Sequence, residues 1–296
     1  KYIQLKHRSF SIRALFKILM FCRNNGIEII HSHGRGAGLY SRLLYLFGFK
    51  VVHTFHGAHF ERTVIGRLKV FLDNFLKNNS NRYICVSEDE YKKAKSLKML
   101  GKTPVSIINN GVAIPQNIDS LELGFEKEGI EFGTLARLSY QKGIDQLLEL
   151  LKEKKLPTNW KFLIAGNGED RDALEEMASK YNLTDSVKFL GNISKPLEFL
   201  KRIDVYFSTS RWEGLPLGVL EAMSLKKPCI LSDVEGHREF NKYNKTVLLY
   251  KDFLTDCEKI VCNKEKYSEY SFKLVSQRFT VKEMSEKTYR TYISLC

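Results

Sequence analysis

The sequence predicts an α/β protein made of two doubly wound domains that face each other across a cleft. Short continuous apolar runs alternate with longer amphipathic stretches along most of the chain, a pattern typical of parallel strands covered by helices on both faces. The alternation stops once, at residues 113–129, and then begins again. With 296 residues, the chain is long enough for two domains that each bury a core of their own.

The first part of the chain contains four expected strands and four expected helices. The strands are expected at 27–30, 51–55, 83–87 and 105–108, and the helices at 9–24, 37–47, 64–78 and 88–100. Ser87 precedes three acidic residues, which is typical of a helix N-cap and first turn. The sequence begins with Lys1, and only a short apolar fragment precedes the first helix. We therefore expect an incomplete first domain over residues 1–115, which lacks an N-terminal strand–helix unit and exposes an apolar edge.

The second part of the chain repeats the alternation with six expected strands. These are expected at 130–136, 160–165, 186–190, 203–208, 228–232 and 246–249. The helices between them are expected at 143–153, 169–180, 195–202 and 217–226. This pattern predicts a linker over 116–129, a second domain over 130–278, and a C-terminal helix over 279–296 that packs back on the first domain.

Composition excludes several classes of protein. Hydrophobic residues make up 43% and charged residues 27%, which is typical of globular domains and excludes disordered and collagen-like chains. The apolar stretch 12–22 is interrupted by Arg13 and Lys17, and it is too short to span a bilayer. The six cysteines form no C-x-x-C pair, so we expect reduced, mostly buried thiols and a cytoplasmic location.

The positive charge is concentrated in the first domain. Of a net charge of +13, residues 1–115 hold 19 Lys and Arg against 6 Asp and Glu, and residues 116–296 hold 28 of each. Such a surplus predicts a polyanionic partner. Because no segment resembles a nucleic-acid-binding module, we expect an anionic membrane surface or a phosphorylated substrate, and no nucleic acid. In helix 9–24 apolar and basic residues interleave, which favours an interfacial helix; the alternative is a helix packed on the sheet.

Two glutamates define the most specific segment, residues 204–239. Glu213 and Glu221 flank a stretch with Pro216 at an expected helix start near Leu217. The free N–H groups at such a helix start suit a phosphate. Two carboxylates beside a phosphate are explained if each holds a hydroxyl group, as a sugar nucleotide provides. The alternative is that Glu221 only complements the helix dipole.

Two cations follow the first strand of the second domain. Arg137 and Lys142 lie in the expected strand–helix loop, at the edge where ligands bind in open α/β sheets. Together they could neutralise a diphosphate leaving group without a metal ion. We therefore expect no metal and no cofactor beyond a nucleotide-sugar co-substrate. The alternative is a solvated surface pair.

Taken in order, the motifs resemble the retaining glycosyltransferases of family 4, also known as glycosyl transferases group 1, which have the GT-B fold of two Rossmann-like domains. The resemblance covers nearly all of 27–240. It is carried by IIHSHGRGAGL (29–39), VVHTFHG (51–57), YICVSE (83–88), IINNGV (107–112), Arg137 with Lys142-Gly143, AGNGE (165–169), FLG (189–191), EGLPLGVLEAM (213–223) and EGHRE (235–239). One departure is Glu235-Gly236, where the family usually has Gly-Gly.

The resemblance implies a role for each matching residue. Catalytic roles fall on His56, Arg137, Lys142 and Glu213, and donor binding on Gly214, Leu215, Pro216, Leu217 and Glu221. In this scheme the two cations grip the donor diphosphate, Glu213 lies near the donor sugar and Glu221 near the ribose. His56 approaches the transferred sugar. The other histidines of the apolar runs, His31, His33 and His53, are expected to be core residues.

The function implied is transfer of a hexose, with retention, from a nucleotide sugar to a hydroxyl of a lipid-linked or saccharide acceptor. We expect this in bacterial surface-polysaccharide or glycolipid synthesis, peripheral at the inner face of the plasma membrane. Two alternatives are a nucleotide-sugar epimerase of the same fold and a non-catalytic fragment that binds a nucleotide sugar.

Overall fold

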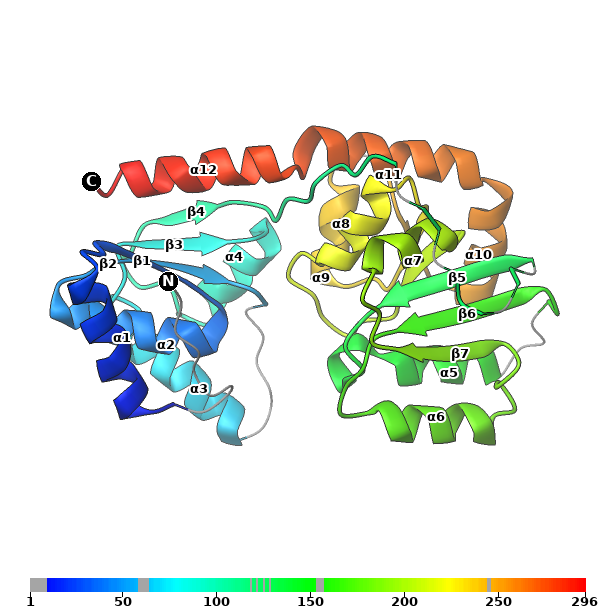
Figure 1. Ribbon diagram of the computed structural model, residues 1–296, viewed down its shortest axis with the longest axis horizontal. Helices are drawn as coiled ribbons and strands as arrows, with labels where there is room; N and C mark the ends of the chain where they lie inside the picture. Colours follow the sequence, from blue (N-terminus) through cyan, green and yellow to red (C-terminus); the bar gives the residue numbers. More distant parts are fainter. Residues whose placement is uncertain are drawn as a thin grey trace. The chain divides into compact units, whose positions relative to one another are not determined.

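The computed structural model describes residues 10–57, 64–117, 119–120, 122–124, 126–127, 129–152, 157–243 and 246–296. The chain divides into two compact units (Figure 1). The first unit comprises Lys1–Asn109 with Met284–Cys296, and the second unit comprises Asn110–Glu283. Each unit is built on a parallel sheet, which confirms the predicted α/β class.

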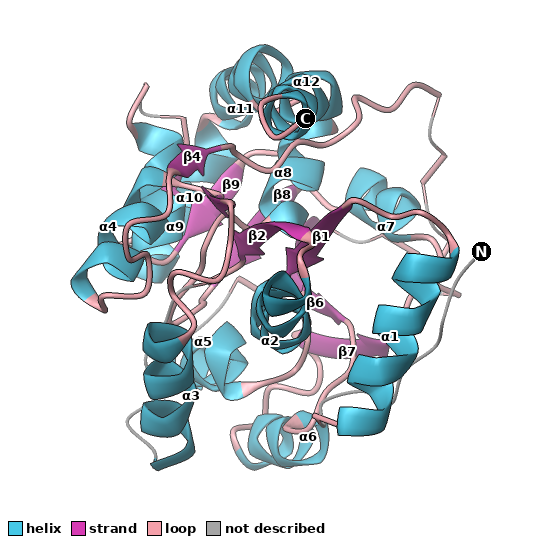
Figure 2. Ribbon diagram, turned by 90° about the vertical axis from the view of Figure 1, so that its left-hand side faces the viewer, coloured by secondary structure: helices cyan, strands magenta, loops and turns pink. Residues whose placement is uncertain are grey.

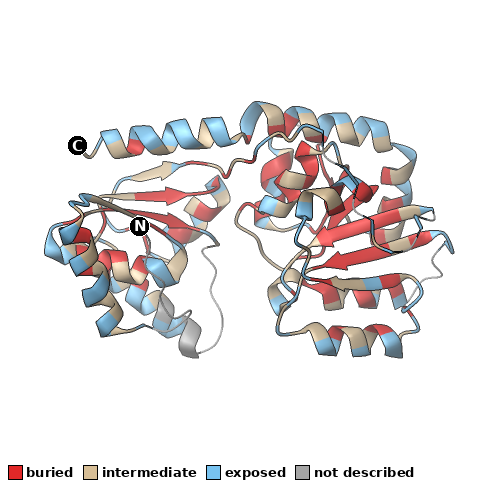
Figure 3. Cartoon of the chain, viewed as in Figure 1, coloured by how far each residue is buried: buried red, intermediate tan, exposed pale blue. Residues whose placement is uncertain are grey.

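The sheet of the first unit has four strands in the order β1-β2-β3-β4, all parallel. The strands are β1 (Ile29–His33), β2 (Lys50–Phe55), β3 (Arg82–Cys85) and β4 (Val105–Ile107). The two central strands are buried over nearly their whole length, as the red arrows of Figure 3 show. This burial explains why their sequences are almost uninterrupted apolar runs.

Helices cover both faces of this sheet. They are α1 (Ile12–Asn24), α2 (Gly34–Leu44) with η1 (Tyr45–Phe47), α3 (Val64–Phe75), α4 (Glu88–Ser96) and most of α12 (Val281–Ile293). On one face, Tyr292 of α12 packs near a cluster that contains Val52 and Ile84. As predicted, Ser87 caps α4, and its hydroxyl accepts a hydrogen bond from Glu90 N at 3.1 Å.

Two helices of the first unit, α1 and α3 (both labelled in Figure 2), have apolar side chains that are exposed to solvent. The inner side of α1 packs Leu19 and Cys22 against α2 and β1, as an ordinary amphipathic helix does. The exposed apolar residues of α1 are Ile12, Phe16 and Met20, and those of α3 are Leu68, Phe71, Leu72 and Phe75. The helical spacing of these residues predicts the helices correctly, but it does not tell which stripe is buried.

The sheet of the second unit has six parallel strands in the order β10-β9-β8-β5-β6-β7. They are β5 (Ile130–Leu135), β6 (Trp160–Ala165), β7 (Val187–Gly191), β8 (Val205–Ser208), β9 (Cys229–Leu231) and β10 (Leu248–Leu249). The chain builds outward from β5 through β6 to β7 and then returns to place β8 on the other side of β5. The boundary between β5 and β8 is therefore a topological switch point, where ligands bind in open α/β sheets.

Helices also cover both faces of the second sheet. Their bounds are η2 (Tyr140–Lys142), α5 (Ile144–Lys152), α6 (Arg171–Lys180), α7 (Pro196–Arg202), α8 (Leu217–Ser224), α9 (Glu235–Arg238), η3 (Glu239–Asn241), α10 (Phe253–Cys262) and α11 (Lys264–Arg278). Helices α5, α6 and α10 share one hydrophobic core with the strands. Helices α7 and α8 contact the sheet through β5, β8 and β9, and α11 lies against α8.

The ten expected strands all occur among the described residues, each displaced by at most a few positions. The described residues of 113–129 form no helix or strand. The six cysteines are free thiols, and four of them are buried, which confirms the prediction of unpaired, mostly buried cysteines. In the part of the chain that the structure describes, no helix combines the length and apolar character needed to cross a bilayer.

Candidate active site at the switch point of the second sheet

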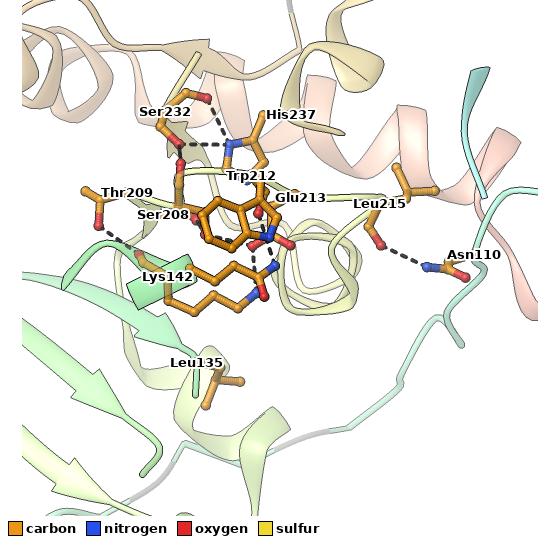
Figure 4. Close-up of polar contacts among 12 residues, drawn as sticks. Asn110, Leu135, Lys142, Ser208, Thr209, Trp212, Glu213, Leu215, Ser232 and His237 are labelled. Atoms are coloured by element: carbon orange, nitrogen blue, oxygen red, sulfur yellow. Dashed lines mark hydrogen bonds and ion pairs between the residues drawn. The ribbon is translucent and has the colours of Figure 1, made fainter. Parts of the chain in front are cut away.

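The loops that follow β5 and β8 lie beside each other because these strands are neighbours. The β5 loop carries Lys142, and the β8 loop carries Glu213. Lys142 Nζ donates a hydrogen bond to Glu213 Oε1 at 2.6 Å (Figure 4). The side chain of Glu213 is only 7% exposed and that of Lys142 25% exposed. The sequence predicts both residues, and the structure brings them together.

Glu213 has a second partner in its own loop. Ser210 Oγ donates to the same carboxylate oxygen at 2.7 Å. Ser232 Oγ donates to the Ser210 carbonyl at 2.7 Å, which ties this loop to the end of β9. The carboxylate and the ammonium group are therefore held in fixed positions at the carboxyl edge of the sheet.

Helix α8 begins directly after this loop, with Pro216 at the N-cap position. The first N–H groups of a helix have no intrahelical acceptor, so they offer a site for an anion beside Lys142. A Cβ at Gly218 would lie 2.8 Å from Tyr206 Oη, so the close approach of α8 to β8 requires glycine there. Asn110 Nδ2 donates to the Leu215 carbonyl at 2.8 Å and holds this loop. Asn110 belongs to the IINNGV motif (107–112), but nothing in that motif predicts this contact.

Glu221 lies in the second turn of α8 and is half-buried. Burial raises the pKa of its carboxyl group. Within the described residues no side chain bonds to this carboxylate, whereas Glu213 has two partners. Glu221 is thus the carboxylate of the predicted pair that is left available for a hydroxyl group.

The structure does not pair Arg137 with Lys142 or with either glutamate. Arg137 instead forms an exposed ion pair with Glu169, at 2.8 Å between Nη2 and Oε2. Backbone hydrogen bonding, with a smaller contribution from Arg137, lowers the pKa of Glu169. Because both partners are exposed, this pair is weak, and Arg137 can exchange it for another anion.

His237 lies beside the Glu213 loop, as Figure 4 shows, and is fully buried. Its Nδ1 lies 2.8 Å from the Ser232 carbonyl oxygen, so Nδ1 carries the proton and donates. Burial lowers the pKa of His237. The neighbouring glycine is required, because a Cβ at Gly236 would lie 2.5 Å from the Gly214 carbonyl oxygen. The Glu235-Gly236 departure therefore preserves the glycine that touches the Glu213 loop.

His56 lies at the end of β2 in the first unit, where its ring is exposed. His56 Nε2 and His33 Nδ1 are 2.9 Å apart and share a hydrogen bond. The prediction that His33 is a core residue is wrong: His33 ends β1, where the sheet stops, and its side chain is exposed. Partial desolvation of the two rings lowers the pKa of both histidines, and the charge of His33 lowers that of His56 further.

The other two histidines of this sheet are more enclosed. His53 is fully buried against α2, with Nδ1 2.9 Å from Ser32 Oγ, as expected of a core residue. His31 is half-buried between Thr54 Oγ1 at 2.7 Å and the Tyr292 hydroxyl at 2.5 Å. The loop that carries His56 is held by Glu90, whose carboxylate accepts hydrogen bonds from Gly57 N and Val86 N. Sequence reasoning did not identify Glu90 as a support of this loop.

The chain contains one D-x-D triplet, Asp170-Arg171-Asp172, a pattern that can bridge a metal ion to a diphosphate. Asp170 occupies the N-cap position of α6 and Asp172 its first turn, where carboxylates complement the helix dipole. Among the described residues, no three His, Cys, Asp or Glu side chains converge as metal ligands.

Lys142, the two glutamates and the start of α8 lie at the switch point of a parallel sheet, where open α/β sheets bind their ligands. A chain with two such parallel sheets has the plan of the GT-B fold. The profile of the family Glycosyl transferases group 1 matches residues 116–277, and that of Glycosyltransferase Family 4 matches residues 1–114. The chain belongs to the group 1 glycosyltransferases of family 4.

Similar proteins agree with this assignment. The chain is 30% identical over 246 residues to UDP-Gal:alpha-D-GlcNAc-diphosphoundecaprenol alpha-1,3-galactosyltransferase of Escherichia coli, which covers 77% of this chain and 62% of that protein. It is 26% identical over 292 residues to the O-antigen biosynthesis glycosyltransferase WbnH of Escherichia coli, over 96% of this chain and 81% of the relative.

Sucrose-phosphate synthase from Thermosynechococcus elongatus has the same fold, with a TM-score of 0.84 and 18% identity over 96% of this chain and 77% of that one. The predicted GT-B fold is thus confirmed. The chain spans 53–63% of the length of three curated relatives that it matches.

Proposed function

We propose that this chain acts in a retaining hexosyltransferase that moves a hexose from a nucleoside diphosphate sugar to a hydroxyl of a lipid-linked or saccharide acceptor. The observation that carries the proposal is the Lys142–Glu213 pair, held at the switch point beside the free N–H groups of α8. The galactosyltransferase relative, named for a UDP-sugar and a diphosphoundecaprenol-linked sugar, supports a uridine nucleotide and a lipid-linked acceptor. The O-antigen relative supports a place in bacterial surface-polysaccharide synthesis.

In this proposal the diphosphate of the donor lies between Lys142 and the start of α8. Positive charge that is already in place stabilises the departing diphosphate as the glycosidic bond breaks. Arg137 exchanges Glu169 for the second phosphate. Glu213 accepts hydrogen bonds from the donor sugar, and Glu221 accepts them from the ribose. The backbone of residues 214–217 contacts the distal phosphate and the sugar.

We propose front-face transfer, with both bond changes on the same face of the sugar. The bond from the anomeric carbon to the diphosphate oxygen breaks, and the acceptor oxygen forms its bond to that carbon. The acceptor proton passes to a donor phosphate oxygen, so no side chain acts as a nucleophile. His56 keeps the role that the family resemblance implies, a contact with the transferred sugar, and no metal is needed because Lys142 and Arg137 neutralise the diphosphate.

We further propose that the first unit binds the inner face of the plasma membrane peripherally. The support is the basic surplus of residues 1–115 and the outer side of α1, where Ile12 and Phe16 are exposed next to Arg13 and Lys17. Basic residues near an anionic surface contribute about 1 kcal/mol each, and the apolar side chains insert among the headgroups. A lipid-linked acceptor lies at the same surface.

Product analysis tests this function. The chain is incubated with UDP-glucose or UDP-galactose, with and without a polyprenyl-diphosphate-linked saccharide, and released nucleotide and sugar products are separated. Nucleotide release that depends on the acceptor, with a new glycoside, is expected. Conversion of the donor sugar without an acceptor would instead show an epimerase. Binding of UDP without any product would show a binding module.

A further inference from the structure

Tyr140 is an exposed aromatic residue two positions before Lys142. It lies in η2, at the carboxyl edge of the second sheet, and 63% of its surface is exposed. The ring is nevertheless held in one orientation, because Arg211 Cζ lies 3.9 Å from its centroid. So large an exposed area means that the ring contributes little to the core. Packing in the core therefore does not explain the position of this ring.

Arg211 is itself fixed by hydrogen bonds on both sides. Its Nη1 donates to the Tyr140 carbonyl at 2.8 Å. Its two terminal nitrogens donate to the two oxygens of Asp145 at 2.7 and 2.5 Å. The hydrogen bond from Arg211 is the main cause of the lowered pKa of Asp145, so the pair stays charged at neutral pH. A guanidinium held in this way stacks on a ring without further loss of freedom.

The Tyr140 loop is also bound to the loop that carries Glu213. Arg211 N donates to the Gln141 carbonyl at 2.8 Å, and Gln141 Nε2 donates to the Trp212 carbonyl at 3.1 Å. The Trp212 ring lies 6.0 Å from that of Tyr140. These contacts, with the Lys142–Glu213 pair, fix the ring relative to the polar residues of the candidate active site.

We propose that Tyr140 is a stacking platform for the pyranose ring of a saccharide substrate. The face under Arg211 is covered, so a ligand meets the other face and the ring edge. An aromatic face carries partial negative charge and attracts the C–H groups on one side of a pyranose, which are partly positive. Hydroxyl groups on the stacked pyranose can then reach Glu213 and Lys142. Ligand sites typically combine an apolar surface with a few placed polar groups in this way.

This inference rests on the proposed function, since it requires a saccharide substrate. The pyranose can belong to the donor or to the acceptor, and the chemistry of stacking is the same for both. A side chain that is already immobilised loses little entropy on binding, which increases the affinity it can provide.

The test uses ligand-observed NMR and calorimetry with five probes: UDP, UDP-glucose, UDP-galactose, methyl α-D-glucopyranoside and methyl α-D-galactopyranoside. The nucleotide sugars report on a donor pyranose and the methyl glycosides on a separate saccharide site. The first variant, Tyr140→Ala, removes the aromatic ring. The second variant, Tyr140→Phe, keeps the ring and removes only the hydroxyl group. Tyr243→Ala is the matched control, because Tyr243 is also exposed, at 42%, and stacks under Arg278 at 4.3 Å. Thermal melting checks that all variants fold.

We expect Tyr140→Ala to weaken the binding of at least one sugar-bearing probe by about three- to tenfold and to leave UDP unchanged. Tyr140→Phe and Tyr243→Ala should bind as the parent chain does. If UDP binds but Tyr140→Ala changes no sugar-bearing probe, the platform is refuted and the donor site stands. If no nucleotide binds, the proposed function fails, and the platform stands only if a methyl glycoside binds in a Tyr140-dependent way.

Discussion

Replacement of Lys142 by alanine should weaken both the fold of the second unit and its affinity for a nucleoside diphosphate. Lys142 Nζ lies 2.6 Å from Glu213 Oε1, and Glu213 is almost fully buried. Alanine leaves this carboxylate with Ser210 Oγ as its remaining side-chain partner. The loss of stability on breaking a partly buried ion pair lies between the small loss for an exposed pair and the large loss for a fully buried one. We expect the free energy of unfolding to fall by about 1–2 kcal/mol and the affinity for UDP to fall about 30-fold, or roughly 2 kcal/mol.

Isothermal titration with UDP measures the affinity, and urea denaturation measures the stability. Lys195→Ala is the matched control, because it removes an exposed ion pair with Glu198 on α7 and should change stability by less than about 0.5 kcal/mol. Adding Glu213→Gln to Lys142→Ala should restore part of the stability but not the affinity for UDP. If Lys142→Ala binds UDP as tightly as the parent chain, or if the double variant regains full affinity, the assignment of Lys142 is wrong.

Three further outcomes are expected. Burial, with the charges of His33 and His56, lowers the pKa of His31 to about 4, below its unfolded value of about 6.5. The unfolded chain therefore binds the proton first, so stability should be complete above pH 6.5 and fall by about 1–2 kcal/mol toward pH 4, less than the full shift because the ring is only half-buried. His31→Gln should make this pH profile of urea denaturation less steep, and an unchanged slope would contradict the assignment. Sugar transfer should survive EDTA, whereas loss of transfer that Mn²⁺ restores would show that a metal is required. In vesicle sedimentation, Phe16→Ser with Lys17→Gln should reduce binding to anionic vesicles, and equal binding of the parent chain to neutral vesicles would exclude the charge-based explanation.

The strands could be predicted closely because parallel strands buried on both faces leave continuous apolar runs. The helices were also predicted, but the side that each buries was not. In α3, Phe71 and Phe75 fit the apolar stripe of a helix packed on a core, yet both are exposed. Helical spacing fixes which residues share a side, and only the neighbouring elements decide whether that side is covered.

The candidate site was predicted in its residue types rather than in its pairings. Lys142 and Glu213 lie 71 positions apart, and their contact depends on β8 lying beside β5, which no local pattern encodes. Arg137 was expected to grip the donor diphosphate together with Lys142, and its ion pair with Glu169 was not predicted.

Two other features of the sites were not predicted either. His33 was assigned to the core from its apolar neighbours, but it ends its strand and contacts His56. The contact of Tyr140 with Arg211 likewise depends on two loops that only the folded sheet brings together.

Mapping of UDP binding by NMR tests whether the switch point of the second sheet is the nucleotide site. UDP is titrated into the ¹⁵N-labelled chain, and the backbone amide shifts are followed residue by residue. We expect the largest shifts at the start of α8, over 214–219, and at Lys142, with smaller ones near Arg137 and Glu221. Shifts confined to the basic helices of the first unit, or no shifts at saturating UDP, would contradict it.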